Sequence, residues 1–240
     1  MSPALLKLIY RPWIGHSARA TLIGRNRSQT NFENGRFTSA DVSNILNRVW
    51  AEYDELASTV PRAPTVGYRM NLLLACMTFS CFRTLLSMDV ERPYAVELIG
   101  DIAWKLYEAW GQLPRAIARL SRRDAREQLR LCVNLFLRFP FGPPGYRFNR
   151  LPSSEGISLD INHCPVASYL KKQGAADLCV GTWCNLDFAL AEMWGGRLER
   201  GETLAAGCAR CDFRFKAGPR VPVVTPGSPT IARISPYGDT

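Results

Sequence analysis

The sequence lacks an apolar stretch long enough to span a lipid bilayer. Its longest apolar run lies between Arg69 and Arg83, well short of the roughly 20 residues that a membrane-spanning helix needs. A secretory signal is not expected either, because Lys7 and Arg11 interrupt the apolar start and no small-residue cleavage pattern follows. These absences predict a cytoplasmic, reducing compartment in which the eight cysteines remain free thiols.

Acidic residues are missing from the first 32 positions, which carry five basic ones. We therefore expect residues 1–34 to form a basic arm that is flexible or packed on the surface. Basic charge also gathers over residues 111–150, where nine arginines face two acids. Apolar residues fill the other helical positions and aromatic interleaving is lacking, so a solvated helix face is expected rather than a nucleic-acid partner. One or two of the arginines are also suited to hold a small carboxylate.

The apolar periodicity predicts that the first half of this chain of 240 residues is helical. A helix capped by Thr38 or Ser39 is expected, with one buried face until the break at Pro61 and Pro64. A core helix that is apolar nearly all round follows over 68–88. Further helices are predicted over 93–111 and 124–138.

After a turn of prolines and glycine at 143–145, the period changes to that of a strand. Ile157, Leu159 and Ile161 alternate with polar residues. Helices are predicted over 165–173 and 177–194, and a hairpin over 197–215. The predicted fold class is α+β, with a helical N-terminal half packed on a C-terminal antiparallel or mixed sheet with covering helices. The predicted organisation is the arm 1–34, one domain over 35–216 with a helical part (35–140) and a strand-helix part (145–216), and a Pro-rich tail over 217–240.

Five of the eight cysteines lie in the last third of the chain, at positions 164, 179, 184, 208 and 211. A zinc or iron–sulfur site is one explanation, because Cys208 and Cys211 have CxxC spacing. Against it, residues 207–215 have the alternation of a strand, on which two cysteines three residues apart point to opposite faces. We therefore predict no metal and no cofactor.

Cys164 is the best candidate for a nucleophilic thiol. It is expected at the N-cap of the helix that begins with Pro165, where unpaired backbone N–H groups favour the thiolate. His163 beside it is suited to shuttle a proton. The alternative is a small buried cysteine that only packs, and the position alone does not separate the two.

Asp187 is the best candidate for a proton donor or acceptor. It lies in a mostly apolar helix one turn after Cys184, so the two side chains share a face. A carboxyl group among apolar neighbours has a raised pKa and suits general acid or base catalysis. Alternatively, Asp187 caps a helix end or pairs with Arg197 or Arg200.

Several short motifs in this region resemble the L-2-amino-thiazoline-4-carboxylic acid hydrolase family. They are Cys164-Pro165-Val166-Ala167, Cys184-x-x-Asp187, Arg197-Leu198-x-Arg200, Thr203-Leu204-Ala205-x-Gly207 and Cys211-Asp212-Phe213-Arg214-Phe215. The resemblance extends over about residues 35–216 and is less specific in the helical part. It implies a hydrolase that opens a thiazoline ring to a carbamoyl-cysteine.

The leading hypothesis is therefore a soluble hydrolase that opens a small carboxylated heterocycle at a C=N or C–S carbon. In this scheme Cys164, aided by His163, attacks that carbon or positions it for water, and Asp187 handles the proton. The pocket is expected to be lined by Cys184 and Cys211, with Arg200 or Arg214 on the carboxylate of the anionic substrate.

Two alternatives from other classes stay open. One is a noncatalytic small-molecule-binding module of the same fold, and the other is a metal protein with Cys179, Cys184, Cys208 and Cys211 as ligands. The strand and helix phases add a geometric prediction. The side chains of Cys164, Cys184, Asp187 and Cys211 border one cavity, and Cys208 lies outside it. The sequence does not specify an oligomeric state.

Overall fold

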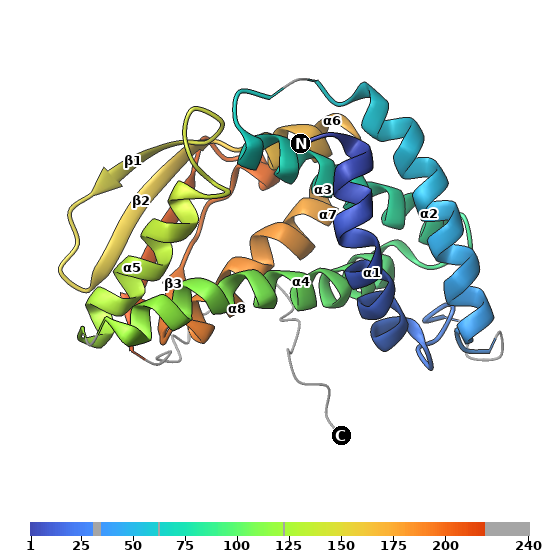
Figure 1. Cartoon of the computed structure of the whole chain (residues 1–240), viewed down its shortest axis with the longest axis horizontal. Helices are drawn as coiled ribbons and strands as arrows, with labels where there is room; N and C mark the ends of the chain where they lie inside the picture. Colours follow the sequence, from blue (N-terminus) through green and yellow to red (C-terminus); the bar gives the residue numbers. More distant parts are fainter. Residues whose placement is uncertain (31–34, 62, 122, 219–240) are drawn as a thin grey trace.

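The computed structural model describes residues 1–30, 35–61, 63–121 and 123–218. Helices form the first half, and a four-stranded antiparallel sheet lies at one side of the molecule (Figure 1). This arrangement confirms the predicted α+β class. Residues 219–240 of the predicted Pro-rich tail lie outside the described residues. No helix within the described ranges is long and apolar enough to cross a membrane.

The helical half consists of α1 (Pro3–Leu22), α2 (Ser39–Thr59), α3 (Val66–Leu86), α4 (Arg92–Leu120) and α5 (Ala125–Arg138). The predicted start of α2 is confirmed by a capping box. The Thr38 hydroxyl accepts a hydrogen bond from the Asp41 amide at 3.2 Å, and the Asp41 carboxylate accepts one from the Thr38 amide at 2.7 Å. Helix α4 continues beyond its predicted end at Gly111, because buried residues as far as Ala118 keep one of its faces against the protein.

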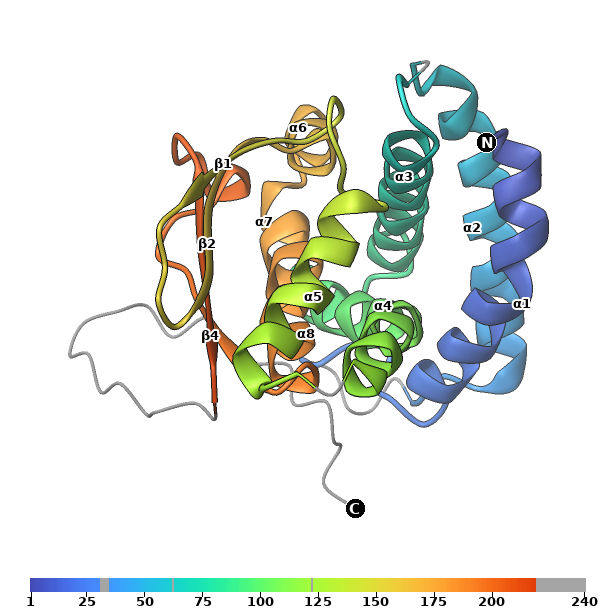
Figure 2. The same ribbon diagram turned by 60° about the vertical axis from the view of Figure 1, so that its left-hand side comes forward.

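Helix α1 lies within the segment that was expected to form an arm. Its Leu6, Tyr10, Ile14 and Leu22 are buried and belong to the larger hydrophobic core. The charge composition of this acid-free segment gave no indication of a helix. Its apolar residues nevertheless recur at three- and four-residue spacing and form the inner face of α1. Residues 3–22 therefore contribute to the core from the outer layer of the molecule, beside α2 (Figure 2).

The sheet contains β1 (Arg147–Leu151), β2 (Gly156–His163), β3 (Gly196–Glu199) and β4 (Cys211–Ala217), in the order β1-β2-β4-β3. Ile161 pairs with Cys211, and Ile157 pairs with Phe215. The predicted strand over 207–215 begins only at Cys211, because a 3₁₀ turn ends at Gly207 with a φ of 94°. Strand β1 was not predicted, since four of its five residues are exposed.

The predicted helix over 177–194 is interrupted by one π-helical turn. It consists of α7 (Ala176–Cys179), η2 (Val180–Cys184) and α8 (Asn185–Met193), after α6 (Pro165–Lys172). Figure 2 shows the layers from left to right as the sheet, then α5 with α8, then α4 and α3, and last α1 with α2.

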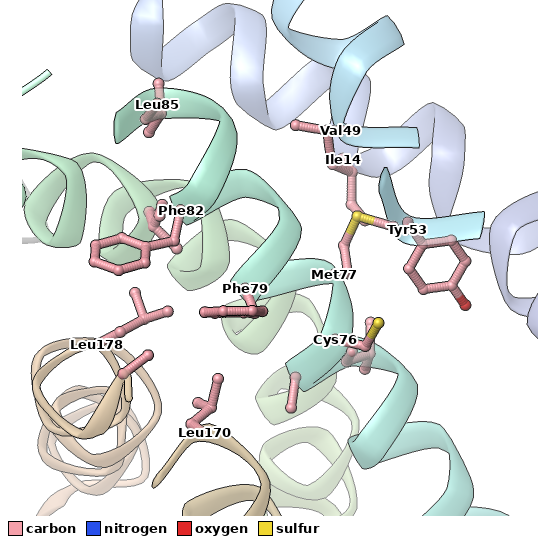
Figure 3. Close-up of a cluster of buried hydrophobic side chains, with 14 of the residues drawn as sticks. Ile14, Val49, Tyr53, Cys76, Met77, Phe79, Phe82, Leu85, Leu170 and Leu178 are labelled. Carbon is pink, nitrogen blue, oxygen red and sulfur yellow. The ribbon is translucent and has the colours of Figure 1, made fainter. Parts of the chain in front are cut away.

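Two hydrophobic clusters fill the spaces between these layers. In the larger one, Phe79 and Phe82 of α3 point toward Leu170 and Leu178, while Met77 lies on the side of α1 and α2 (Figure 3). The smaller cluster lies between the sheet, α5 and α8. The candidate site lies where the two clusters meet, because its lining includes residues of both.

Candidate active site

A cavity of about 100 Å³ lies between the sheet and helices α4, α5 and α8. Most of its lining is apolar. The polar or ionisable side chains that reach it from the last third of the chain are those of Cys164, Cys179, Cys184, Asp187, Arg200 and Cys211. The prediction that Cys164, Cys184, Asp187 and Cys211 border one cavity is confirmed, and Cys208 is not among the lining residues.

Cys164 follows β2 and is the N-cap of α6, as predicted. Its Sγ accepts a hydrogen bond from the Ala167 amide at 3.5 Å. Burial nevertheless raises the pKa of the Cys164 thiol above its ordinary value and outweighs this hydrogen bond. Burial in this cavity therefore opposes the thiolate that the helix end favours. The sequence indicated the helix end but not the apolar residues that remove water from the sulfur.

Cys184 has the opposite electrostatic environment. A hydrogen bond from the Cys179 thiol lowers the pKa of Cys184, and the positive charge of Arg200 and the Thr203 hydroxyl act in the same direction against burial. The Thr203 hydroxyl lies 3.5 Å from the sulfur atoms of both Cys184 and Cys211. Thr203 belongs to a motif noted in the sequence, but its contact with two thiols depends on how the loop before β4 folds.

Arg200 forms an ion pair with Asp187, with 3.1 Å between Nη1 and Oδ2. It also donates a hydrogen bond of 3.0 Å to the Cys184 carbonyl, and its guanidinium lies over the rings of Phe188 and Phe213. The Arg200 side chain is 4% exposed and that of Asp187 is 22% exposed. Burial raises the pKa of Asp187 to about 7, although the charge of Arg200 opposes the shift.

Two residues of the predicted site lie elsewhere. Nδ1 of His163 lies 2.9 Å from the Gly145 carbonyl oxygen, and the ring does not line the cavity. Arg214 donates hydrogen bonds to Asp160 and to the Leu159 carbonyl. Its position on β4 alternates with the cavity-facing positions of Cys211, Phe213 and Phe215, so it faces the other side of the sheet.

Two tyrosines of the cavity wall are not among the residues predicted from the sequence: Tyr107 of α4 and Tyr146 before β1. The Asn71 side-chain amide donates a hydrogen bond of 2.9 Å to the Tyr146 hydroxyl. Asn71 is fully buried in the otherwise apolar helix α3, and its Oδ1 has no hydrogen-bond partner within the described part of the chain. A lone amide inside an apolar helix was the sequence signal that pointed to a polar partner there.

Metal ligation has little geometric support in the described residues. No group of three or more His, Cys, Asp or Glu side chains among them is arranged to hold a metal ion. Of the CxxC pair, Cys211 begins β4 and faces the cavity, whereas Cys208 lies in the turn that precedes the strand.

Fold and site together define an α+β protein with a buried apolar cavity that brings thiols together with a carboxyl–guanidinium pair. Residues 108–215 match the model of the L-2-amino-thiazoline-4-carboxylic acid hydrolase family, which confirms the resemblance carried by the motifs. The family name denotes hydrolysis of a thiazoline carboxylic acid. The matched segment contains the thiols, carboxyl group and guanidinium described above and begins within α4, so α1, α2 and α3 lie outside it. No curated protein and no solved structure matches the chain.

Proposed function

We propose that the protein is a hydrolase that opens a small carboxylated, thiazoline-like heterocycle at its C=N or C–S carbon. The observation that carries the proposal is the Asp187–Arg200 pair, which lies beside four thiols in a cavity whose lining is mostly apolar. The family match supports the reaction class, and the cavity volume of about 100 Å³ suits a substrate of the size of one small ring.

Arg200 is proposed to bind the carboxylate of the substrate. Its guanidinium is already held over the rings of Phe188 and Phe213 and by the Cys184 carbonyl. The guanidinium is therefore oriented to bind a second carboxylate before the substrate arrives. The incoming carboxylate competes with Asp187 for this positive charge. The pKa of Asp187, already about 7, then rises further, and the carboxyl group is protonated when the ring is bound.

Cys184 is the favoured nucleophile because its pKa is the one that the site lowers. Its thiolate attacks the amidine-like carbon and forms a C–S bond, and the ring C–S bond breaks. The departing ring sulfur takes the proton of Asp187, which acts as the general acid. Cys164 lines the same cavity and is the second candidate for the attacking thiol.

Water then completes the reaction. It adds to the same carbon, one of its protons goes to the Asp187 carboxylate, and the other moves from the added oxygen to the former ring nitrogen. The Cys184 thiolate leaves, and the product is the carbamoyl-cysteine with its free thiol. One water is consumed per ring, and both protein groups return to their starting protonation states.

The test is turnover of L-2-amino-2-thiazoline-4-carboxylate, measured by chromatography and mass spectrometry of the carbamoyl-cysteine product. We expect Cys184→Ser and Asp187→Asn each to lower kcat by at least about 100-fold, because covalent and acid–base catalysis typically contribute that much. Cys208→Ser, outside the cavity, is the matched control and should retain wild-type turnover. Loss of activity in Cys164→Ser but not in Cys184→Ser would reassign the nucleophile to Cys164.

The proposed acid role predicts the pH dependence of the reaction. Asp187 must enter the cycle protonated, and its pKa is about 7 in the free protein. We expect kcat/KM to fall about tenfold per pH unit at pH values above about 7. Wild-type protein that binds the ring without turning it over at any pH would instead support the noncatalytic binding module.

A further inference from the structure

A second cavity, of about 500 Å³, lies on the other side of Tyr107 and Trp183 from the reaction cavity. Both residues line both cavities. Their rings meet edge to face, with centroids 6.1 Å apart. We call the larger space the chamber. The wall between the chamber and the reaction cavity is therefore only one layer of aromatic side chains thick.

The chamber lies between α1, α3 and α4, is partly open to solvent, and has a mostly apolar lining. Six of the residues that form this surface are Ile14, Leu74, Met77, Ile99, Ile102 and Leu106. Three lining residues can carry charge: His16 and Lys105 are exposed at the outside, and Glu108 is half-buried. Trp13 is also exposed at the outside, by 58%. A space of this kind suits an apolar group that enters from solvent and loses its hydration water on binding.

The first turn of α8 connects the two spaces. Leu186 lines the chamber, and its neighbour Asp187 lines the reaction cavity. Trp183, in the π-helical turn just before, is held by one hydrogen bond of 3.2 Å from its indole N–H to the Thr78 hydroxyl. Trp183 is therefore one of the two rings that separate the chamber from the carboxyl group and thiols of the reaction cavity.

We propose that the chamber accommodates an apolar substituent of the substrate whose ring occupies the reaction cavity. This inference rests on the proposed function and names its substrate class: a thiazoline-type carboxylate with an alkyl or aryl group on the amidine-like carbon. The smaller cavity has room for the ring and the larger one for its substituent. Much of the chamber is built from α1 and α3, outside the segment that matches the family model, so the family match does not itself imply this preference.

The reaction on such a substrate balances as ring opening. Water adds to the substituted carbon, the C–S bond breaks, and the sulfur and nitrogen each take a proton. The product is an N-acyl-cysteine. The test compares 2-heptyl- with 2-methyl-2-thiazoline-4-carboxylate, which share the ring chemistry and differ only in apolar length. For the wild-type protein we expect kcat/KM to be at least about tenfold higher for the heptyl compound, because binding in the chamber buries its methylene groups away from water.

Chamber-filling variants locate the effect. Ala103→Phe on α4 and Cys81→Phe on α3 each add a ring to the chamber lining. Both variants are expected to raise KM for the heptyl compound about tenfold or more. Turnover of the methyl compound should stay within about twofold of the wild-type value, which would also show that the variants are folded. Ala116→Phe, exposed on the same helix α4, is the matched control and should change neither. Equal effects on the two compounds, or no preference in the wild-type protein, would overturn the proposal.

Measurements of ligand binding distinguish failure of this inference from failure of the proposed function. Trp13, Trp110 and Trp183 line the chamber, so its occupation by the heptyl compound is measurable through tryptophan fluorescence. If neither ring is turned over but the heptyl compound binds the wild type more tightly than Ala103→Phe, the hydrolase fails and the chamber assignment stands. If the methyl compound is turned over and Ala103→Phe binds both compounds like the wild type, the hydrolase stands and the chamber assignment fails.

Discussion

The buried positive charge of Arg200 acts on the ionisation of two groups beside it, Asp187 and Cys184. It stabilises negative charge on both Asp187 and Cys184, while burial disfavours that charge on both. For Asp187 burial is the larger effect, and the pKa rises to about 7. For Cys184 the hydrogen bond from Cys179, together with Arg200 and Thr203, is larger than burial, and the pKa falls. The same cation therefore acts to lower the pKa of a carboxyl group and of a thiol in one cavity.

This difference predicts the order in which the buried thiols react. Burial raises the pKa of Cys76 and of Cys132 to about 11, and raises that of Cys164 as well. We expect iodoacetamide at pH 7.5 to alkylate Cys184 at least about tenfold faster than these three, because only the thiolate is the nucleophile. Peptide mass spectrometry over a time course measures each rate.

Arg200→Met provides the control for that experiment, since it removes the charge and keeps an apolar side chain of comparable length. We expect alkylation of Cys184 in this variant to slow toward the rate of Cys164. Faster labelling of Cys164 than of Cys184 in the wild-type protein would contradict the electrostatic assignment of the two thiols.

At the scale of elements, the crossing of α4 and α8 positions the carboxyl group of the site. Gly111 lies at this crossing, and its carbonyl accepts a hydrogen bond of 3.0 Å from the Trp194 indole N–H. A methyl group at Gly111 would lie 2.6 Å from Cδ2 of Leu190 and would also overlap the end of Met193. Glycine therefore lets α8 approach α4 closely, with Asp187 on its first turn.

We expect Gly111→Ala to lower the free energy of unfolding by about 1–2 kcal/mol, because the overlap with α8 outweighs the better helix propensity of alanine. Gly15→Ala on α1 is the matched control. A methyl group there has its nearest neighbour at 3.3 Å, at the flexible end of the Arg19 side chain, so we expect no loss of stability. Urea unfolding measures both. Equal stability of the two variants would show that the helices can separate without cost.

At the scale of the whole molecule, α1 joins the core that supports the chamber and the site. Leu6 is fully buried and Leu8 is 75% exposed, although they are two residues apart. We expect Leu6→Ala to lower the free energy of unfolding by about 2–5 kcal/mol and Leu8→Ala to change it by less than about 0.5 kcal/mol. Thermal or urea unfolding measures the difference. An unchanged stability of Leu6→Ala would mean that α1 behaves as a detached arm.

The local patterns of the sequence predicted much of this molecule. Thr38 as a helix cap, the apolar helix after Tyr68, the alternation of Ile157, Leu159 and Ile161, and Cys164 as an N-cap all depend on neighbours within a few residues. Such neighbours set backbone hydrogen bonding and side-chain phase, which sequence spacing records. The shared face of Cys184 and Asp187, and their meeting with Cys211, followed from the same phases.

Only the tertiary structure decided which of these groups are ionised and which reach the cavity. The pKa of Cys164 rises because elements distant in sequence, among them α4 and β4, exclude water from a sulfur that its own helix end would have stabilised as a thiolate. His163 and Arg214 have suitable chemistry and face elsewhere, whereas Tyr107 and Thr203 face the thiols. Desolvation and charge pairing depend on distances between remote parts of the chain, and no local pattern contains those distances.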